Sequence, residues 1–390
     1  MNNCFEALPQ RNNSYKWKDL KYEDTLSLDI ADMDFNLSNE ILSKFKERIE
    51  RGSFGYEFEG ESYYDAICAW YKRNHNLKIE KKWIVSTPGV INGIKTCVNA
   101  FSKKGDAVMV LSPLYHSYVT ATEGNERRVV YCDMVYDNGT YQVDFGKLTS
   151  LIETEKVKIF IFCNPNNPTG KVFSKEEIKK ILGICEENDV LVISDEVYED
   201  FIFEGNTFHS CIEYKHKCKK LIVAKSLCKT FNVAGIQVAN FLIYNDSLRE
   251  QYKREKSKRS YMANNAMGIA MTENLYTYGD NWHRECFDYI IENMDIFKKI
   301  IKEKYPDISI CKSQSLYMLW IDFSKVLAPS IDIEKFFLDK MHLKIANGER
   351  FGKEGQYKNF VRINFACPRF IVLEMIKRMD EALKKYERKI

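Results

Sequence analysis

The sequence lacks the features that mark several large classes of protein. No run in its 390 residues approaches the roughly 18 consecutive apolar residues of a membrane-spanning helix, and the opening MNNCFEALPQRNN has no apolar segment of the kind that a secretion signal carries. Lys and Arg total 58 against 55 Asp and Glu, so the net charge of +3 gives no reason to expect nucleic acid or an anionic membrane as a partner. We therefore expect a soluble, cytoplasmic protein that binds neither.

The sequence also lacks a CxxC pair, although it has 12 cysteines. Most of them lie in apolar stretches, which is typical of reduced thiols in the cytosol. One group, His209, Cys211, His216 and Cys218, offers four metal-ligating side chains, but its HxC-x4-HxC spacing matches none of the common zinc patterns. We interpret this group as part of an ordinary exposed loop and predict no metal, with metal binding as the alternative.

No internal repeat, low-complexity tract or Pro/Gly/Ser-rich linker divides the chain, so its organisation is inferred from its elements. Four short, continuous apolar runs predict parallel strands that are buried on both faces. These runs are residues 106–113, 157–165, 189–196 and 220–226. A helix is predicted over 175–188, opened by a capping box of Ser174 and Glu177. Strands and helices in alternation indicate an α/β domain with a mostly parallel sheet.

From about residue 285 the pattern changes to an amphipathic helix, two strand-like segments and a long terminal helix over 369–390. We predict a smaller α+β domain over 285–390, a large domain over 46–284, and an N-terminal arm over 1–45 that contributes to the small domain. The alternative is a single large doubly wound domain. It is less favoured because the last hundred residues lack continuous buried strands.

Polar side chains follow the predicted strands at their carboxyl ends, which is where open α/β sheets bind ligands. Asn167 follows the second run, Asp195 and Tyr198 end or follow the third, and Ser226 and Lys229 end or follow the fourth. No GxGxxG follows a strand, and GKVFSKEE lacks the P-loop spacing, so a dinucleotide or a nucleoside triphosphate is poorly supported. An amine, a carboxylate, an amide and a phenol suit pyridoxal phosphate better, because that cofactor has an aldehyde, a ring nitrogen and a ring hydroxyl.

Eight segments in order make the chain resemble the fold-type I pyridoxal-phosphate enzymes of the aminotransferase class I/II superfamily, and in particular their cystathionine β-lyase branch. The segments are ADMDF (31–35), GSFGYEFEGESYYDAICAWYKRNH (52–75), WIVSTPGVING (83–93), SPLYHSY (112–118), NPNNPTGKVFS (164–174), SDEVY (194–198), KTFNVAGIQ (229–237) and FVRINFACPR (360–369). The resemblance covers nearly the whole chain. It implies the PLP-dependent transferase-like fold, pyridoxal 5'-phosphate as cofactor, a small amino-acid substrate and a homodimer with shared active sites.

The resemblance also implies roles for individual residues at the cofactor. Lys229 resembles the lysine that bonds the cofactor aldehyde, Asp195 the partner of the ring nitrogen, and Ser226 a phosphate ligand. Lys225 is then interpreted as a solvated side chain or a structural ion pair. Tyr115 resembles the aromatic residue that stacks on the ring, with a core tyrosine as the alternative.

Three further parts of the site come from other segments. Gly89, Val90 and Ile91 follow a predicted strand and open a helix, so their amides can hold the phosphate with help from the helix dipole. Tyr56 resembles a tyrosine that reaches the phosphate of the neighbouring subunit. Arg362, together with Asn167, resembles the pair that binds the substrate α-carboxylate, a task that suits a planar guanidinium.

Two positions bear on the reaction. Gln237 stands eight residues after Lys229, where many aminotransferases have an arginine, and it resembles the lyase branch. Tyr198 stands in DEVY where the lyase branch usually has DEIH, and it resembles the aminotransferases. The resemblance implies a carbon-sulfur β-lyase that cleaves a cysteine-derived thioether to thiol, pyruvate and ammonia, with Lys229, Asp195 and Tyr198 as catalytic residues. An aminotransferase of L-amino acids is the first alternative, and a regulatory protein that keeps the fold but binds a transcription factor is the second.

Overall fold

The structure is a computed structural model, and it describes residues 4–259 and 264–387. Its strands are β1 (Leu26–Ser27), β2 (Ile84–Thr87), β3 (Ala107–Ser112), β4 (Arg128–Asp133), β5 (Val135–Asp137), β6 (Thr140–Gln142), β7 (Val157–Cys163), β8 (Leu191–Asp195), β9 (Leu221–Lys225), β10 (Ala239–Leu242), β11 (Ser309–Ile310), β12 (Met318–Asp322), β13 (Leu343–Lys344), β14 (Ala346–Asn347) and β15 (Phe360–Asn364). Its α-helices are α1 (Asn39–Glu50), α2 (Glu61–His75), α3 (Val90–Phe101), α4 (Ser117–Glu123), α5 (Phe145–Thr154), α6 (Lys175–Glu187), α7 (Leu227–Thr230), α8 (Asp246–Lys258), α9 (Ala266–Tyr278), α10 (Asp280–Lys304), α11 (Ile333–Met341) and α12 (Arg369–Glu387). Short 3-10 helices are η1 (Lys81–Trp83), η2 (Cys211–Tyr214), η3 (Ala234–Ile236) and η4 (Gly348–Phe351).

A seven-stranded sheet forms the centre of the large domain, with the strand order β2-β10-β9-β8-β7-β3-β4 in the described part of the chain. The five strands from β9 to β4 run parallel, whereas β10 is antiparallel to both β9 and β2. The four predicted runs are β3, β7, β8 and β9, so the prediction of a mostly parallel sheet is confirmed. The predicted capping box is confirmed too, because Ser174 and Glu177 exchange hydrogen bonds at the start of α6.

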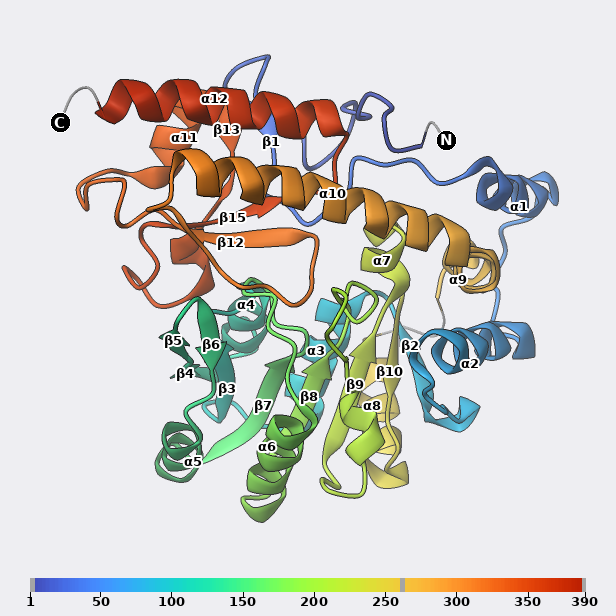
Figure 1. The fold of residues 1–390 in the computed structure, drawn as a ribbon. Helices are drawn as coiled ribbons and strands as arrows, with labels where there is room; N and C mark the ends of the chain where they lie inside the picture. Colours follow the sequence, from blue (N-terminus) through green and yellow to red (C-terminus); the bar gives the residue numbers. More distant parts are fainter. Residues whose placement is uncertain (1–3, 260–263, 388–390) are drawn as a thin grey trace.

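The large sheet is buried on both faces because alternate residues of its strands pack against different helices. On β7, Phe160 and Phe162 belong to the hydrophobic cluster that includes α6, which lies in front of the sheet in Figure 1. Ile159 and Ile161 belong to a second cluster, which contains residues of α3 and α8 on the other face. A continuous apolar run is therefore what this position in the fold requires.

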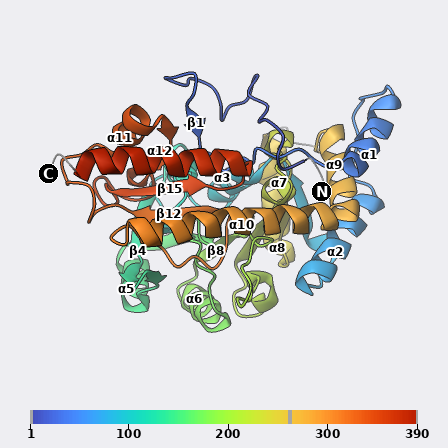
Figure 2. The ribbon, with the colours of Figure 1, turned by 45° about the horizontal axis from the view of Figure 1, so that its top comes forward.

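The second, smaller sheet has the order β11-β12-β15-β14 and lies above the large sheet in Figure 1. Figure 2 shows α10 and α12 running side by side over β12 and β15. The N-terminal arm joins this part of the molecule, since β1 pairs in parallel with β13. The predicted boundary between residues 284 and 285 falls inside α10, and the division into domains stays a prediction.

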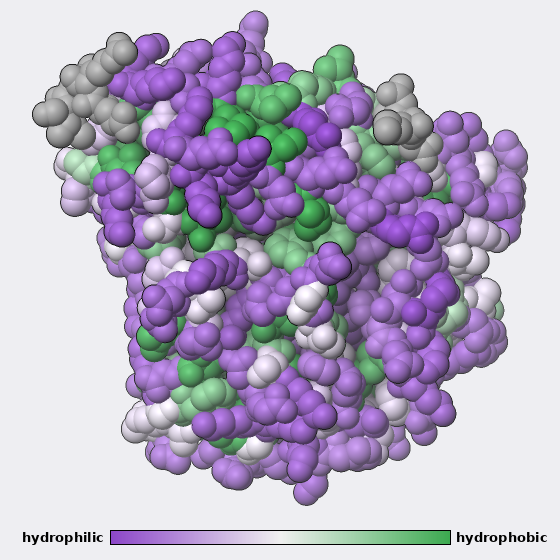
Figure 3. All heavy atoms as spheres, viewed as in Figure 1, coloured by the Kyte–Doolittle hydropathy of each residue, from purple (hydrophilic) through white to green (hydrophobic). Residues whose placement is uncertain are grey.

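The face of the molecule shown in Figure 3 is mostly hydrophilic, with hydrophobic side chains gathered between α10 and α12. In the described residues, no helix is long and apolar enough to cross a membrane. The segment before α2 carries three exposed aromatic side chains, Phe54, Tyr56 and Phe58.

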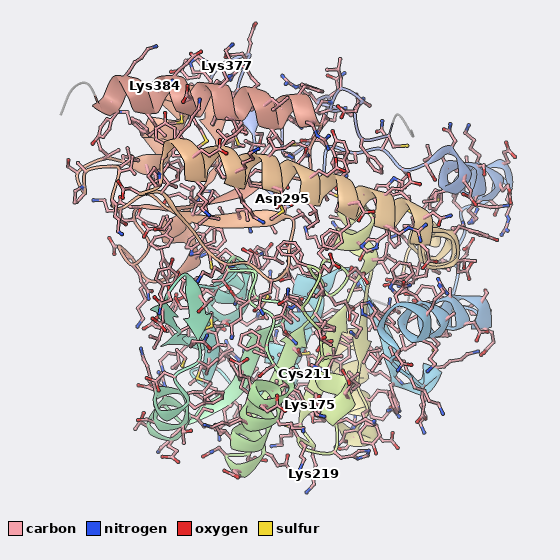
Figure 4. All side chains as sticks on the ribbon, in the orientation of Figure 1. Lys175, Cys211, Lys219, Asp295, Lys377 and Lys384 are labelled. Atoms are coloured by element: carbon pink, nitrogen blue, oxygen red, sulfur yellow. The ribbon has the colours of Figure 1, made fainter. Side chains whose placement is uncertain are left out.

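The four possible metal ligands between residues 209 and 218 lie on and around η2. The prediction of an exposed loop is wrong for the two cysteines, because Cys211 and Cys218 are buried in the main hydrophobic cluster. Figure 4 labels Cys211, which lies inside the large domain, where η2 packs against β9 and α6. His216 instead packs edge-on against the ring of Tyr244, and no group of three or more metal-ligating side chains occurs in the described residues.

Candidate active site

A cavity of about 690 Å³ lies between the carboxyl ends of the large-sheet strands, the N-terminal arm and the small domain. It collects every site residue predicted from the sequence except Tyr56. The predicted residues that line it are Gly89, Val90, Ile91, Tyr115, Asn167, Asp195, Tyr198, Ser226, Lys229 and Arg362. Gln237 lines the same cavity. The sequence rule that ligands bind beyond the carboxyl ends of parallel strands therefore locates this cavity correctly.

Asp195, the last residue of β8, presents a buried carboxylate to the cavity. The Tyr118 hydroxyl donates to its Oδ2 at 2.7 Å, and the Val197 amide donates to its Oδ1 at 3.3 Å. Burial raises the pKa of Asp195 to about 6, because the charged form is poorly solvated there. In the described part of the chain no Lys, Arg or His lies within 4 Å of this carboxylate, so it has room for a cationic ring nitrogen.

Lys229 lies on the four-residue helix α7, directly after β9. Ser226 caps this helix: its hydroxyl accepts from the Cys228 amide at 3.1 Å and donates to the Val238 carbonyl at 2.6 Å. The Lys229 amine is not used in a close ion pair, and it donates to the Ala31 carbonyl at 2.9 Å. The amine is thus held at the cavity and free of a strong structural partner.

Lys225 has the opposite environment, although it is only four residues away. It is fully buried and forms ion pairs with Glu196 at 2.8 Å and with Glu199. Its ammonium also lies over the ring of Tyr71. Of the two interpretations of Lys225, the structural ion pair is confirmed and the solvated side chain is wrong.

Arg362 lies on β15 and reaches the cavity from the small domain. Its Nη1 donates to Oδ1 of Asn167 at 2.8 Å, and its Nη2 donates to the Asp29 carbonyl at 2.7 Å. Its buried Nε has no hydrogen-bond partner, and in the described residues no Asp or Glu side chain lies within 4 Å of the guanidinium. A buried guanidinium with a spare donor and no acid fits the carboxylate of a ligand.

Gly89 precedes α3 and turns the chain so that the helix begins at the cavity. Its φ of +83° lies in the left-handed region, which glycine adopts readily, and no side chain caps the first turn. The first amides of α3, those of Val90 and Ile91 included, therefore keep their hydrogen-bonding capacity for an anion, and the helix dipole favours one there.

Two tyrosines complete the walls of the cavity. Tyr198 is buried, and burial raises the pKa of its phenol. Tyr115 is partly exposed, so the alternative of a core tyrosine is not supported, and its ring meets the Tyr118 ring edge-on at 5.5 Å. These residues fit pyridoxal phosphate: Lys229 can bond its aldehyde, Asp195 can pair with its ring nitrogen, and the start of α3 can hold its phosphate.

Sequence reasoning missed Tyr118 and the backbone carbonyls of Asp29 and Ala31. Tyr118 had a signal, because it stands in the same SPLYHSY segment as Tyr115, directly after a predicted strand. No pattern in the sequence marks the two carbonyls. Tyr56 is fully exposed and outside the cavity, and its role stays a prediction.

The comparisons with known proteins agree with this site. Residues 23–376 match the family Aminotransferase class I and II. The chain is 28% identical to cystathionine beta-lyase PatB of Bacillus subtilis over 361 residues, which cover 92% of this chain and 93% of PatB. It is also 28% identical to protein MalY of Escherichia coli over 350 residues, covering 89% and 88% of the two chains.

A solved structure extends the similarity to the whole fold. The crystal structure of cystalysin from Treponema denticola, which contains a pyridoxal 5'-phosphate cofactor, superimposes with a TM-score of 0.93 at 29% identity and covers 98% of this chain and 99% of cystalysin. The chain therefore belongs to the aminotransferase class I and II family of fold-type I pyridoxal-phosphate enzymes.

Proposed function

We propose that this protein is a carbon-sulfur β-lyase that cleaves an L-cysteine-derived thioether, such as L-cystathionine, to a thiol, pyruvate and ammonia. The observation that carries the proposal is the arrangement of three charged groups on one cavity: the Lys229 amine, the buried Asp195 carboxylate and the Arg362 guanidinium, which lacks an acid partner among the described residues. Pyridoxal phosphate, when bound, supplies an aldehyde that bonds amines and a ring that withdraws electrons from the substrate Cα.

Individual residues of the chain bind the substrate, move the proton and stabilise charge. Arg362 and Asn167 bind the α-carboxylate and so orient the substrate, with the Asn167 amide keeping the guanidinium in place. Lys229 accepts the Cα proton at Nζ as general base. Asp195, held ionised by the Tyr118 hydroxyl, stabilises positive charge on the ring nitrogen. The buried Tyr198 closes the cavity beside Asp195 and Arg362, because both contribute to the electrostatic environment of its phenol.

The choice of a lyase rests on similarity and on two positions. PatB is named a cystathionine beta-lyase, and Gln237 lines the cavity where many aminotransferases have an arginine. Tyr198 favours the second candidate, an aminotransferase of L-amino acids, whose product would be a keto acid. A protein that only binds a regulatory partner is less well supported, because it would not need the Lys229, Asp195 and Arg362 set.

One assay separates the two candidates. L-Cystathionine is added to the holoenzyme with and without 2-oxoglutarate, and pyruvate and free thiol are measured. We expect pyruvate and thiol in equal amounts without the acceptor, abolished in Lys229→Ala, and transfer from L-alanine to 2-oxoglutarate slower by at least roughly tenfold, which is about 1.4 kcal/mol in barrier. Product that appears only when 2-oxoglutarate is supplied would contradict the lyase.

The same assay tests the carboxylate site. Arg362→Ala removes the guanidinium, and the loss in kcat/KM should be on the order of 2–5 kcal/mol in either reaction. Lys377→Ala is the control, because that side chain is exposed on α12, and Figure 4 shows it on the outside of the molecule. A loss in kcat/KM below tenfold in Arg362→Ala would show that this residue does not bind the substrate carboxylate.

A further inference from the structure

The acceptor of the Lys229 amine comes from the N-terminal arm, almost 200 residues earlier in the chain. Lys229 Nζ donates to the Ala31 carbonyl at 2.9 Å, and Oδ1 of Asp32 lies 4.0 Å from the same nitrogen. The Ala31 carbonyl also accepts from the Tyr317 hydroxyl at 2.9 Å. A carbonyl has two lone pairs, so these two donors use its full capacity.

Side chains from two other parts of the molecule fix the backbone of this segment. Asn364 Nδ2 donates to the carbonyls of Ile30 and Asp32, both at 2.8 Å. Asn232 binds both the amide and the carbonyl of Met33, again at 2.8 Å each. Asn232 lies three residues beyond Lys229, so the helix that carries the amine is tied to the segment that accepts it. The Ala31 carbonyl is therefore held at a fixed place relative to Lys229.

The two acids of the ADMDF segment have different environments. Asp34 has a structural role, because its carboxylate accepts hydrogen bonds from the Lys16 amine at 2.8 Å and from the Trp17 indole at 3.0 Å. Asp32 is partly exposed, and in the part of the chain that the structure describes Lys229 is the one cation within 4.0 Å of its carboxylate. The fold thus places one acid to hold the arm and leaves the other facing the amine.

We propose that the Ala31 carbonyl and the Asp32 carboxylate form an acceptor pair that holds the Lys229 amine whenever it is not bonded to the cofactor. The inference rests on the proposed role of Lys229 as base. When Lys229 takes a proton from the substrate Cα, its neutral amine becomes an ammonium with three N–H donors and a positive charge. The Ala31 carbonyl keeps the hydrogen bond that it already accepts from the amine, while the Asp32 carboxylate accepts from the added N–H and balances the charge. Asp32 and Tyr317 are positioning residues, since both act through Lys229 and its carbonyl acceptor.

The first test uses the cofactor-free protein and measures by absorbance how fast it captures pyridoxal phosphate at one fixed pH near neutrality. Capture requires the neutral amine, and Asp32→Asn removes the carboxylate that holds the amine as an ammonium. The rate constant of capture should therefore rise at least about threefold in Asp32→Asn and return most of the way in Asp32→Glu. Asp19→Asn is the matched control, since Asp19 lies on the same arm with an exposed side chain whose ion-pair partner is Lys18. An unchanged rate constant in Asp32→Asn would overturn the inference.

The second test uses the loaded enzyme with L-cystathionine that carries deuterium at Cα. Weaker stabilisation of the ammonium makes proton removal slower, so kcat should fall about tenfold or more in Asp32→Asn while KM changes less than about threefold, and the isotope effect on kcat should increase. Tyr317→Phe should change the same quantities in the same direction by less. A fall in kcat with no change in the isotope effect would mean that Asp32 acts only on structure, and would also overturn the inference.

The two proposals can fail separately. If wild-type enzyme needs 2-oxoglutarate to make product, the lyase is wrong, but the rate of cofactor capture still reports on Asp32. If pyruvate is released without an acceptor and the capture rate of Asp32→Asn is unchanged, the lyase stands and the acceptor pair is wrong. Thermal unfolding of each variant, compared with Asp19→Asn, establishes that the proteins compared are folded.

Discussion

The Tyr118 hydroxyl donates a 2.7 Å hydrogen bond to Oδ2 of Asp195, and both side chains are buried. The bond stabilises the ionised carboxylate in a place where burial alone disfavours it. Tyr115 lies two residues before α4 and Tyr118 is the second residue of that helix, so one short segment supplies a ring to the cavity wall and a donor to the acid.

Replacing Tyr118 with Phe should weaken cofactor binding. The variant loses a hydrogen bond to a charged group, worth about 1.5–3 kcal/mol, so the pKa of Asp195 should rise further and its pairing with the ring nitrogen should weaken. We expect the Kd of pyridoxal phosphate, measured by absorbance titration at pH 7, to increase roughly ten- to a hundredfold. Tyr278→Phe, at an exposed position on α9, should have no effect. A Kd within twofold of wild type in Tyr118→Phe would contradict the prediction.

The stability of the cofactor-free protein should depend on pH through Asp195. Its pKa is 3.8 in the unfolded chain and about 6 in the folded protein, so the folded state binds the proton more tightly. Its contribution to the free energy of unfolding is therefore fully present below pH 3.8 and is lost as pH rises through 6, by about 3 kcal/mol in all.

Asp195→Asn removes that dependence. The free energy of unfolding of the variant minus that of wild type, from urea titrations without cofactor, should increase by about 3 kcal/mol between pH 3 and pH 7.5. Asp19→Asn, which changes an exposed acid, should give a flat difference. A flat difference for Asp195→Asn as well would show that the carboxyl titrates normally in the folded protein.

Lys225→Met should destabilise the fold without moving the cofactor. The substitution leaves Glu196 and Glu199 buried without their cation, which costs about 3–5 kcal/mol in the free energy of unfolding. Lys253→Met, at an exposed position of α8, should stay within about 0.5 kcal/mol. Borohydride reduction and peptide mapping of the holoenzyme should find the cofactor on Lys229 in all three proteins, and label on Lys225 in wild type would reverse the assignment.

We also expect a homodimer in which Tyr56 reaches the phosphate of the other subunit. Its side chain is fully exposed between Phe54 and Phe58, which are exposed too, and such a group of aromatic residues is typical of an interface. Tyr56→Phe should raise the Kd of pyridoxal phosphate with an unchanged unfolding temperature, whereas Tyr136→Phe, exposed on β5, should not. Sedimentation velocity checks the assembly, and a fully active monomer would exclude a shared site.

Much of the fold could be predicted because the sheet is buried on both faces. β3, β7, β8 and β9 are continuous apolar runs, which is the pattern that strands covered by helices on both faces require. β10 was missed because it is short and contains Asn240, whose buried amide oxygen accepts from the Tyr63 hydroxyl at 2.7 Å. Because Asn240 interrupts the apolar residues of β10, the sequence there does not show the continuous apolar run of a buried strand.

In the candidate site, too, some features could be predicted from the sequence and others could not. That Lys229, Asp195 and Arg362 line one cavity could be predicted, because they stand in recognisable segments, and their roles stay predictions. The carbonyls of Asp29 and Ala31 could not, because every residue has a carbonyl and only the fold decides which one meets Arg362 or Lys229. Cys211 and Cys218 were placed in an exposed loop because polar neighbours surround them, whereas the structure turns their sulfurs into the core.

The parallel pairing of β1 with β13 has a consequence for the order of events during synthesis. Leu26 leaves the ribosome more than 300 residues before its partner Leu343, which at 5–20 residues per second is a delay of roughly 15–60 s. The arm that carries Ala31 cannot take its place until the last part of the small domain has been made, although the large-domain sheet, complete at β10, can form earlier. A nascent chain can therefore fold its large sheet while Lys229 still lacks its acceptor, so we expect activity to be acquired only at the end of translation.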